Sequence, residues 1–203
     1  MQSARSNPAK FGQAFYQTGS ISASLAPTAA RQSVGASFVH ADAGYSFPGP
    51  WKPRLSVEFD RASGDRAGGS YGRFDTLFGM RRAELVPAGL YNAVGRANIV
   101  TPGMRLEAAP DKRWDWFAVY RAMWLASRTD AFSTTGVRDS SGRSGNFAGH
   151  QIEARVRYWI IPSRLRFEFD GVALAKGKFL TEAPNAPSAK WTRYTSFNLT
   201  AGF

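Results

Sequence analysis

Residues 152–160 read Ile-Glu-Ala-Arg-Val-Arg-Tyr-Trp-Ile, and apolar side chains occupy every second position of this stretch. Glu153, Arg155 and Arg157 stand between them. Because successive side chains of a β-strand point to opposite faces of the sheet, this alternation predicts a strand with one apolar and one polar face. Residues 165–175 and 54–60 show the same period of two. The sequence therefore predicts an all-β fold built from strands that separate two environments.

Eight segments are predicted as strands. They are 11–20, 33–47, 54–62, 95–108, 113–127, 150–161, 164–176 and 191–203. Pro102 lies inside the fourth segment and cannot donate a ladder hydrogen bond. We therefore expect it to mark a bulge or to demote that strand.

The connections between these segments alternate in length. Short turns rich in Pro, Gly or Asp are predicted at 47–53, 109–112 and 162–163, whereas long loops cover 63–94, 128–149 and 177–190. Short turns on one side and long loops on the other are typical of outer-membrane barrels. We predict an antiparallel transmembrane β-barrel of about eight strands over residues 1–203, with 1–10 disordered, or else a segment of a larger barrel. The alternative is a soluble sandwich or lipocalin-like barrel with its apolar face inside.

Composition limits the partners of the chain. Its 26 Lys and Arg exceed 15 Asp and Glu, which gives a formal charge of +11 and indicates an anionic partner. There is no Cys, and 14% of residues are aromatic, including six Trp. No apolar stretch reaches the ~18 residues of a membrane-spanning helix. Residues 1–8 contain no apolar signal segment. We expect the chain to be a fragment, a truncated reading frame or one domain of a longer protein.

The last predicted strand carries a possible assembly signal. Phe197, Leu199, Ala201 and Phe203 share one face, and the final residue is aromatic. This pattern resembles the signal read by the barrel-assembly machinery, although an aromatic residue often occupies the position of Ala201. The alternative is an ordinary edge strand.

Several further segments carry a family resemblance. They are Pro50-Trp-Lys-Pro-Arg-Leu55 leading into Phe59-Asp-Arg-Ala-Ser-Gly-Asp65, Gly72-Arg-Phe-Asp-Thr-Leu-Phe78, Gly149-His-Gln-Ile-Glu153 and Gly177-Lys-Phe-Leu180. In this order they resemble the alginate export family of outer-membrane porins, over roughly residues 30–203. The resemblance implies a monomeric porin in a Gram-negative outer membrane that exports an acidic polysaccharide such as alginate and needs no cofactor. Family members are much longer, so the chain resembles their C-terminal half.

The polar face of the strands would then line the pore. The predicted lining residues are Arg54, Glu58, Asp60, Arg105, Glu107, Arg121, Glu153, Arg155, Arg157, Arg166, Glu168 and Asp170. Arg presents a planar fork that matches a carboxylate, which suits a polyuronate. Interspersed Asp and Glu would hold the Arg side chains in place. The alternative is that these charges only neutralise one another in a plugged, non-conducting lumen.

The fifth strand has apolar residues on both faces. Trp114, Trp116, Tyr120 and Trp124 share one parity, as expected of aromatic girdles at the two membrane interfaces. The opposite parity is also apolar. Its members are Phe117, Val119, Met123 and Leu125. The pattern alone does not explain this second apolar face.

Enzymatic and metal sites are not expected. His40 and His150 have neither Cys neighbours nor ligand spacing, and Ser37 lies on the opposite face from His40. The run Gly64–Gly72 is not followed by a helix, so we interpret it as an extracellular loop rather than a phosphate-binding one. Arg81, Arg82 and residues 138–143 are interpreted as loop charge facing lipopolysaccharide.

Three functions therefore stay open. The first is a porin that passes anionic polysaccharide, with outer-membrane lipid, lipopolysaccharide and the assembly machinery as partners and no nucleic acid. The second is a structural or enzymatic barrel with a plugged lumen. The third is a soluble basic β-protein that binds nucleic acid.

Overall fold

The computed structural model describes residues 8–22, 29–66, 68–75, 85 and 93–202. Its elements are β1 (Pro8–Ser22), β2 (Arg31–Ser46), β3 (Arg54–Ala62), β4 (Ile99–Ala108), β5 (Trp114–Trp124), β6 (Phe147–Ile161), β7 (Leu165–Lys176), α1 (Lys178–Glu182) and β8 (Trp191–Ala201). All eight predicted strands are present. The short helix α1 was not predicted, and no described helix has the length and hydropathy to span a membrane.

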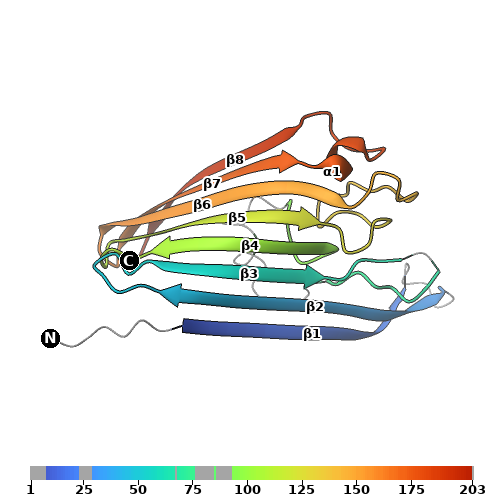
Figure 1. Ribbon diagram of the computed structural model, residues 1–203, viewed down its shortest axis with the longest axis horizontal. Coiled ribbons are helices and arrows are strands. Elements are labelled where there is room, and N and C mark those ends of the chain that lie inside the picture. Colours follow the sequence, from blue (N-terminus) through green and yellow to red (C-terminus); the bar gives the residue numbers. More distant parts are fainter. Residues whose placement is uncertain (1–7, 23–28, 67, 76–84, 86–92, 203) are drawn as a thin grey trace.

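The strands form one antiparallel sheet in sequence order, β1 to β8. Figure 1 shows the β2–β3, β4–β5 and β6–β7 turns at its left side, where β1 begins and β8 ends, and the longer connections at the right. We call these the turn side and the loop side. The predicted separation of short turns from long loops is thus confirmed. Within the described residues no pairing joins β1 to β8, so these strands form the two edges of the sheet.

Several strand boundaries differ from the prediction. β1 begins at Pro8, so residues 8–10, expected to be disordered, pair with β2; residues 1–7 lie outside the described residues. β4 begins at Ile99 rather than at 95, because Asn98 has a φ of 44° and leaves the strand conformation. Pro102 stays in β4 opposite Phe59, but Thr101 and Pro102 have no partner in β5. The β4–β5 register is the same on both sides of this gap, so Pro102 interrupts the pairing without a bulge, and the expectation of a bulge or a demoted strand is wrong.

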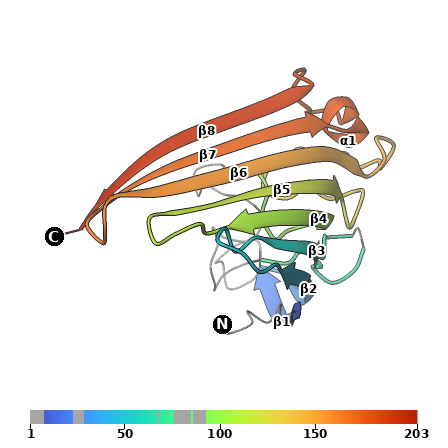
Figure 2. The same ribbon diagram turned by 60° about the vertical axis from the view of Figure 1, so that its left-hand side comes forward.

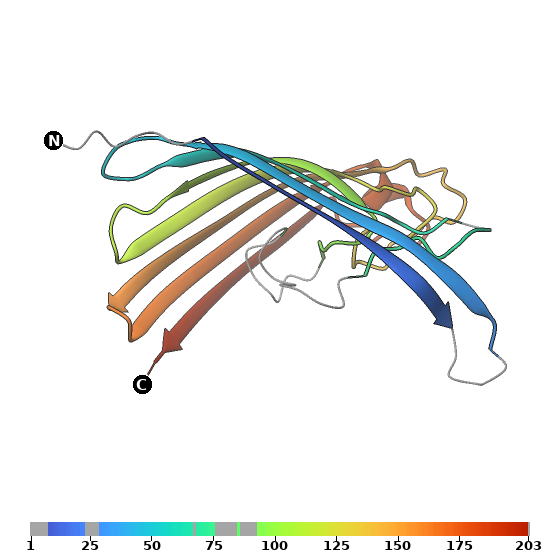
Figure 3. The same ribbon diagram turned by 90° about the horizontal axis from the view of Figure 1, so that it is seen from below.

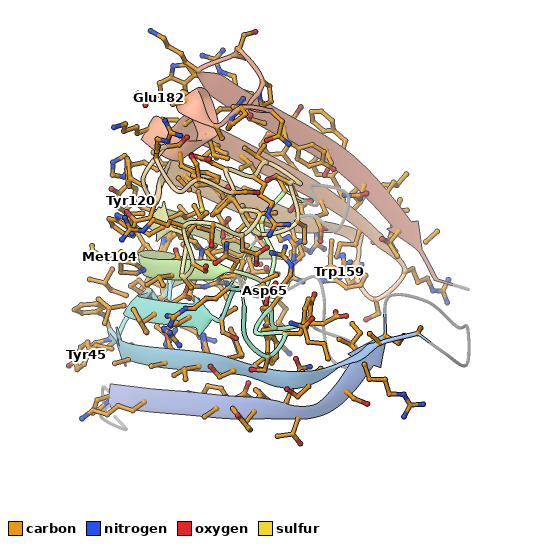
Figure 4. All side chains as sticks on the ribbon, turned by 90° about the vertical axis from the view of Figure 1, so that its right-hand side faces the viewer. Tyr45, Asp65, Met104, Tyr120, Trp159 and Glu182 are labelled. Carbon is orange, nitrogen blue, oxygen red and sulfur yellow. The ribbon has the colours of Figure 1, made fainter. Side chains whose placement is uncertain are left out.

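The sheet is curved (Figures 2 and 3), and its two faces differ in the side chains that they carry. Figure 4 shows Tyr45, Met104 and Tyr120 projecting from the convex side, while Trp159 projects into the concave side. In β3 the alternation is complete: Leu55, Val57 and Phe59 are exposed on the convex face, and the intervening side chains are covered. We call the convex face outer and the concave face inner. Because so many large apolar side chains are exposed on the outer face, lipid is its natural environment.

The buried core lies against the loop-side half of the inner face. Strand residues such as Phe38, Ile99 and Met123 form one buried cluster there with residues of the long connections, such as Phe132 and, in α1, Phe179. The other members are Ala36, Ala62, Phe74, Leu85, Val94, Leu125, Val137, Ala148, Val172, Leu174, Leu180 and Ala183. We call this set the loop cluster. It means that the long connections fold back onto the sheet, so one end of the inner face is apolar and covered.

Candidate pore lining: an ion-pair network on the inner face

The strand register gathers the predicted lining residues on one face. One row runs across six strands, in which each residue is the direct partner of the next: Arg54, Glu107, Phe117, Arg155, Asp170 and Ser196. Side chains directly opposite on antiparallel strands lie within contact distance. Basic and acidic groups from distant parts of the chain thus become neighbours on the turn-side half of the inner face.

Arg121 of β5 is the centre of the network. Its side chain is 1% exposed, and its guanidinium lies 2.7 Å from Glu58 Oε2, 3.4 Å from Asp60 Oδ2 and 3.6 Å from Glu153 Oε1. Asp60 also contacts His40, with 2.7 Å between Oδ1 and Nδ1. A buried guanidinium is tolerated only where carboxylates compensate its desolvation. Arg121 therefore ties together three strands, β3, β5 and β6, and Asp60 extends the network to His40 of β2.

A second group joins β2, β3 and β4. Arg54 forms ion pairs with Asp42 and with Glu107, whose Oε1 lies 3.4 Å from Arg54 Nη1. Arg105 Nε reaches Glu107 Oε2 at 2.7 Å. Glu107 therefore bridges two arginines, and the pairs form a continuous polar strip rather than isolated contacts.

A third group covers β5 to β8. Arg155 Nε lies 2.7 Å from Asp170 Oδ1, and Asp170 also accepts hydrogen bonds from Ser196 and Asn198. Glu168 lies between Arg155 and Arg166, at 3.7 Å and 3.8 Å. The remaining pair joins Arg157 Nε to Asp115 Oδ1 at 2.7 Å. This group extends the ion pairs across to the β8 edge.

Every one of the twelve predicted lining residues is in an ion pair. The prediction omitted Asp42 and Asp115, although both lie on the polar parity of their strands. With these two, six Arg side chains meet eight carboxylates among the described residues. The inner wall is thus a mixed lattice of charges, and the +11 of the chain comes from residues elsewhere.

The apolar inner parity of β5 now has an explanation. The Arg105 guanidinium lies 3.9 Å from the centroid of the Phe117 ring, and that of Arg155 lies 5.6 Å from it. An aromatic face attracts a cation, so Phe117 separates two arginines that would otherwise repel each other. Met123, further along the strand, belongs to the loop cluster. The inner-facing side chains of β5 are thus aromatic where the arginines lie and aliphatic where the loops cover the sheet.

The loops are fastened by polar contacts as well as by the loop cluster. Asn98 is fully buried; its Nδ2 donates to the carbonyls of Ser127 and Ala131, and its Oδ1 accepts from Ser127 N–H. Arg73 donates to Asp130 at 2.8 Å and to the carbonyls of Ala131 and Ser133. The connections 63–98 and 125–146 therefore hold each other in place over the inner face.

The two histidines lie apart. His40 lies on the inner face beside Asp60, whereas His150 lies on the outer face, with its Nδ1 2.7 Å from Tyr120 Oη. No group of three or more His, Cys, Asp or Glu residues in the described part of the chain could hold a metal ion. Phe197 and Leu199 are exposed on the outer face of β8, at 70% and 66%, and Phe203 lies outside the described residues.

Comparison with known proteins agrees with this architecture. The alginate export family model matches residues 9–192 of the 203. None of the curated proteins matches the chain. Members of the matched family are outer-membrane β-barrels that act as polysaccharide export channels. Because the match spans most of the sequence, the chain belongs to the alginate export family.

Proposed function

We propose that the inner face of this sheet is the wall along which an anionic polysaccharide such as alginate passes outward. The observation that carries the proposal is the pattern of the wall: six arginines, each held by carboxylates, on the face opposite an apolar, lipid-compatible one. A guanidinium pairs with a sugar carboxylate through the same two N–H groups that it uses for Asp or Glu. The chemistry of the wall therefore matches the chemistry of a polyuronate.

Passage would proceed by exchange of ion-pair partners. The side chains of Arg157 and Asp115 are both about one-third exposed, at 35% and 34%, so a passing carboxylate could displace Asp115. Displaced wall carboxylates then compete for the arginine and release the substrate, which conduction requires. Arg121 is too deeply buried for this role and serves to position the strands.

Planar-bilayer conductance tests the proposal. The chain, refolded in detergent and added to the bilayer, is expected to give anion-selective steps that an alginate oligomer blocks. The variant Arg155→Gln/Arg157→Gln should move the reversal potential towards that of an unselective pore. Arg113→Gln/Arg164→Gln on the turn side is the matched control, because it removes two cations outside the network. An unchanged reversal potential in the double variant would contradict the proposed role of the wall.

A plugged lumen is the second candidate, and the loop cluster favours it. Connections from three parts of the chain pack on the inner face and bury Phe132 and Phe179. If this packing persists in the membrane, the refolded chain gives no steps despite intact β-structure. Removing residues 130–140, which contain Phe132 and Val137 of the loop cluster, should then restore conductance.

Assembly and partners form part of the same proposal. Phe197, Leu199 and Phe203 would present the assembly signal on the outer face of β8, and lipopolysaccharide would surround a monomeric barrel. Neither an enzymatic reaction nor a cofactor is needed for passage by ion-pair exchange. Replacing Phe203 by Ser should reduce the amount of folded protein in the outer membrane if the signal operates.

A further inference from the structure

A pocket opens at the loop-side end of the sheet, away from the ion-pair network. Its volume is about 260 Å³. It is lined by Gly35, Arg61, Ser63, Gly64, Arg66, Gly69, Ser70, Gly72 and Ala126. Most of these residues come from the glycine-rich run after β3, which sequence analysis interpreted only as a surface loop.

The pocket arises where β2 extends beyond β3. β3 ends at Ala62, and the segment around Tyr71 takes its place beside β2. Gly35 N donates to Tyr71 O at 3.0 Å, and Tyr71 N donates to Ser33 O at 2.7 Å. The loop therefore leaves the sheet and returns to it, and the pocket lies within this excursion.

Hydrogen bonds fix the two ends of the excursion. Gly72 N donates to Asp65 Oδ1 at 3.0 Å, and Asp65 N donates to Asp130 Oδ2 at 2.9 Å. Ser37 N donates to Ser63 Oγ at 2.8 Å. Gly72 approaches Gly64 so closely that an added Cβ would lie 2.9 Å from the Gly64 carbonyl oxygen. The walls are therefore made of fixed backbone with few side chains.

The charge of the pocket is strongly one-sided. It has two arginines and two serines but no Asp or Glu among its lining residues. Within the described residues, neither Arg61 nor Arg66 forms an ion pair, unlike all six arginines of the inner wall. The nearby Asp65 carboxylate already accepts the Gly72 N–H. Two cations thus share a small polar pocket without an acidic partner.

The position of Arg61 indicates whether the pocket opens towards the lipid or towards the pore. By strand alternation Arg61 belongs to the outer face, and its direct neighbours across the ladders are Val39 and Val100. Arg61 is exposed at the loop-side limit of the apolar outer face. A cation at this boundary faces the headgroup region of the lipid rather than the pore.

We propose that this pocket binds a phosphate group, as carried by a lipid headgroup at the membrane surface or by free phosphate. Two guanidinium forks and two hydroxyls supply donors of the kind that phosphate oxygens accept. The inference does not depend on the chain conducting, because the pocket lies outside the proposed substrate path.

Binding of a phosphorylated glycolipid in detergent micelles tests the proposal. The folded wild-type chain should bind a bisphosphorylated glycolipid about tenfold more tightly than its dephosphorylated counterpart. Arg61→Gln/Arg66→Gln should abolish this preference, and Arg61→Lys/Arg66→Lys should retain part of it. The control Arg113→Gln/Arg164→Gln removes the same charge at the turn side and should leave the preference intact.

Inorganic phosphate identifies the source of the phosphate group. If it competes with the glycolipid on the wild-type chain, the phosphate itself is recognised; if it binds where the glycolipid does not, the ligand is the free anion. The proposal is overturned if the wild-type chain neither prefers the phosphorylated glycolipid nor binds inorganic phosphate, or if the Gln variant keeps the wild-type binding with its β-structure intact. Should the Gln variant not fold, the Lys variant and the competition experiment decide.

Discussion

The two halves of the inner face are stabilised by different interactions, ion pairs in one and apolar packing in the other. On the turn side the wall consists of charged side chains that neutralise one another, and much of it is only partly covered. On the loop side the wall is apolar and is covered by the loop cluster. The charged half resists the loss of a partner, because each remaining charge is then left unpaired. The apolar half depends instead on close packing, and its loops can separate from the sheet without breaking strand pairs.

The largest expected effect comes from removing the charge at the centre of the network. Arg121→Met leaves Glu58, Asp60 and Glu153 without their common partner, and we expect a loss of about 3–5 kcal/mol in the free energy of unfolding. Urea unfolding in detergent micelles measures this loss. The matched variant Arg157→Met breaks a partly exposed pair and should lose less than about 1 kcal/mol. Equal effects would show that burial does not distinguish the two pairs.

Truncation of the apolar half should act locally. Phe179 is fully buried in the loop cluster, and Phe179→Ala should weaken the packing of the loops by about 3 kcal/mol. We expect faster protease cleavage within 125–146 and 177–190, with the strands unchanged. Ile152→Ala, on the exposed outer face, is the control and should leave loop cleavage unaffected. Cleavage at the wild-type rate in Phe179→Ala would mean that polar contacts alone hold the loops.

The aromatic base of the charged half should contribute less. Phe117→Leu removes the ring beneath Arg105 and should lower the free energy of unfolding by about 1 kcal/mol. A double-mutant cycle with Arg105→Gln separates the cation–π contact from general packing. If the two losses simply add, the ring acts only as an apolar spacer.

The smallest effect concerns pH and the loop that contains Asp139. Hydrogen bonds from Ser141 Oγ, Ser144 N–H and Ser144 Oγ hold the pKa of Asp139 well below its ordinary value of 3.8. The depressed pKa stabilises the folded loop fully above pH values near 3.8, and this contribution is lost as the pH falls through the folded-state pKa. The protection factor of the Ser144 amide, which corrects for the intrinsic pH dependence of exchange, should therefore fall on acidification.

Asp139→Asn is the control for this pH dependence. It should give a lower Ser144 protection factor than wild type at pH 7 and little further change on acidification, because its side chain carries no titrating carboxyl. Identical pH profiles for the two chains would exclude Asp139 as the origin of the effect.

The strands could be predicted because each has one apolar and one polar face, and these faces produce a period of two in the sequence. Alternation in 54–60 and 152–160 assigns Glu58, Arg155 and Arg157 to one face, and the structure places all three there. Register then follows from the short turns, which leave little freedom for strand slippage. The same alternation also assigns Asp42 and Asp115 to the inner face, so both could have been predicted as lining residues.

The loop cluster and the pairing of the arginines could not be predicted in this way. Phe132 and Phe179 lie in segments without period two, so nothing in the local pattern shows that they join the same buried cluster as Met123. Which carboxylate meets Arg121 of β5 depends on side-chain geometry between this strand and two others, β3 and β6. Both features arise from tertiary contacts between segments far apart in the chain.

The two edge strands of the sheet limit how many further strands any barrel that contains it can have. β1 runs from the turn side to the loop side and β8 runs back, so the two edges are antiparallel to each other (Figure 1). In hydrocarbon each unpaired backbone group costs several kcal/mol, so both edges must find partners. An all-antiparallel closure can therefore join β1 directly to β8 or insert an even number of further strands, whereas an odd number would force one parallel seam.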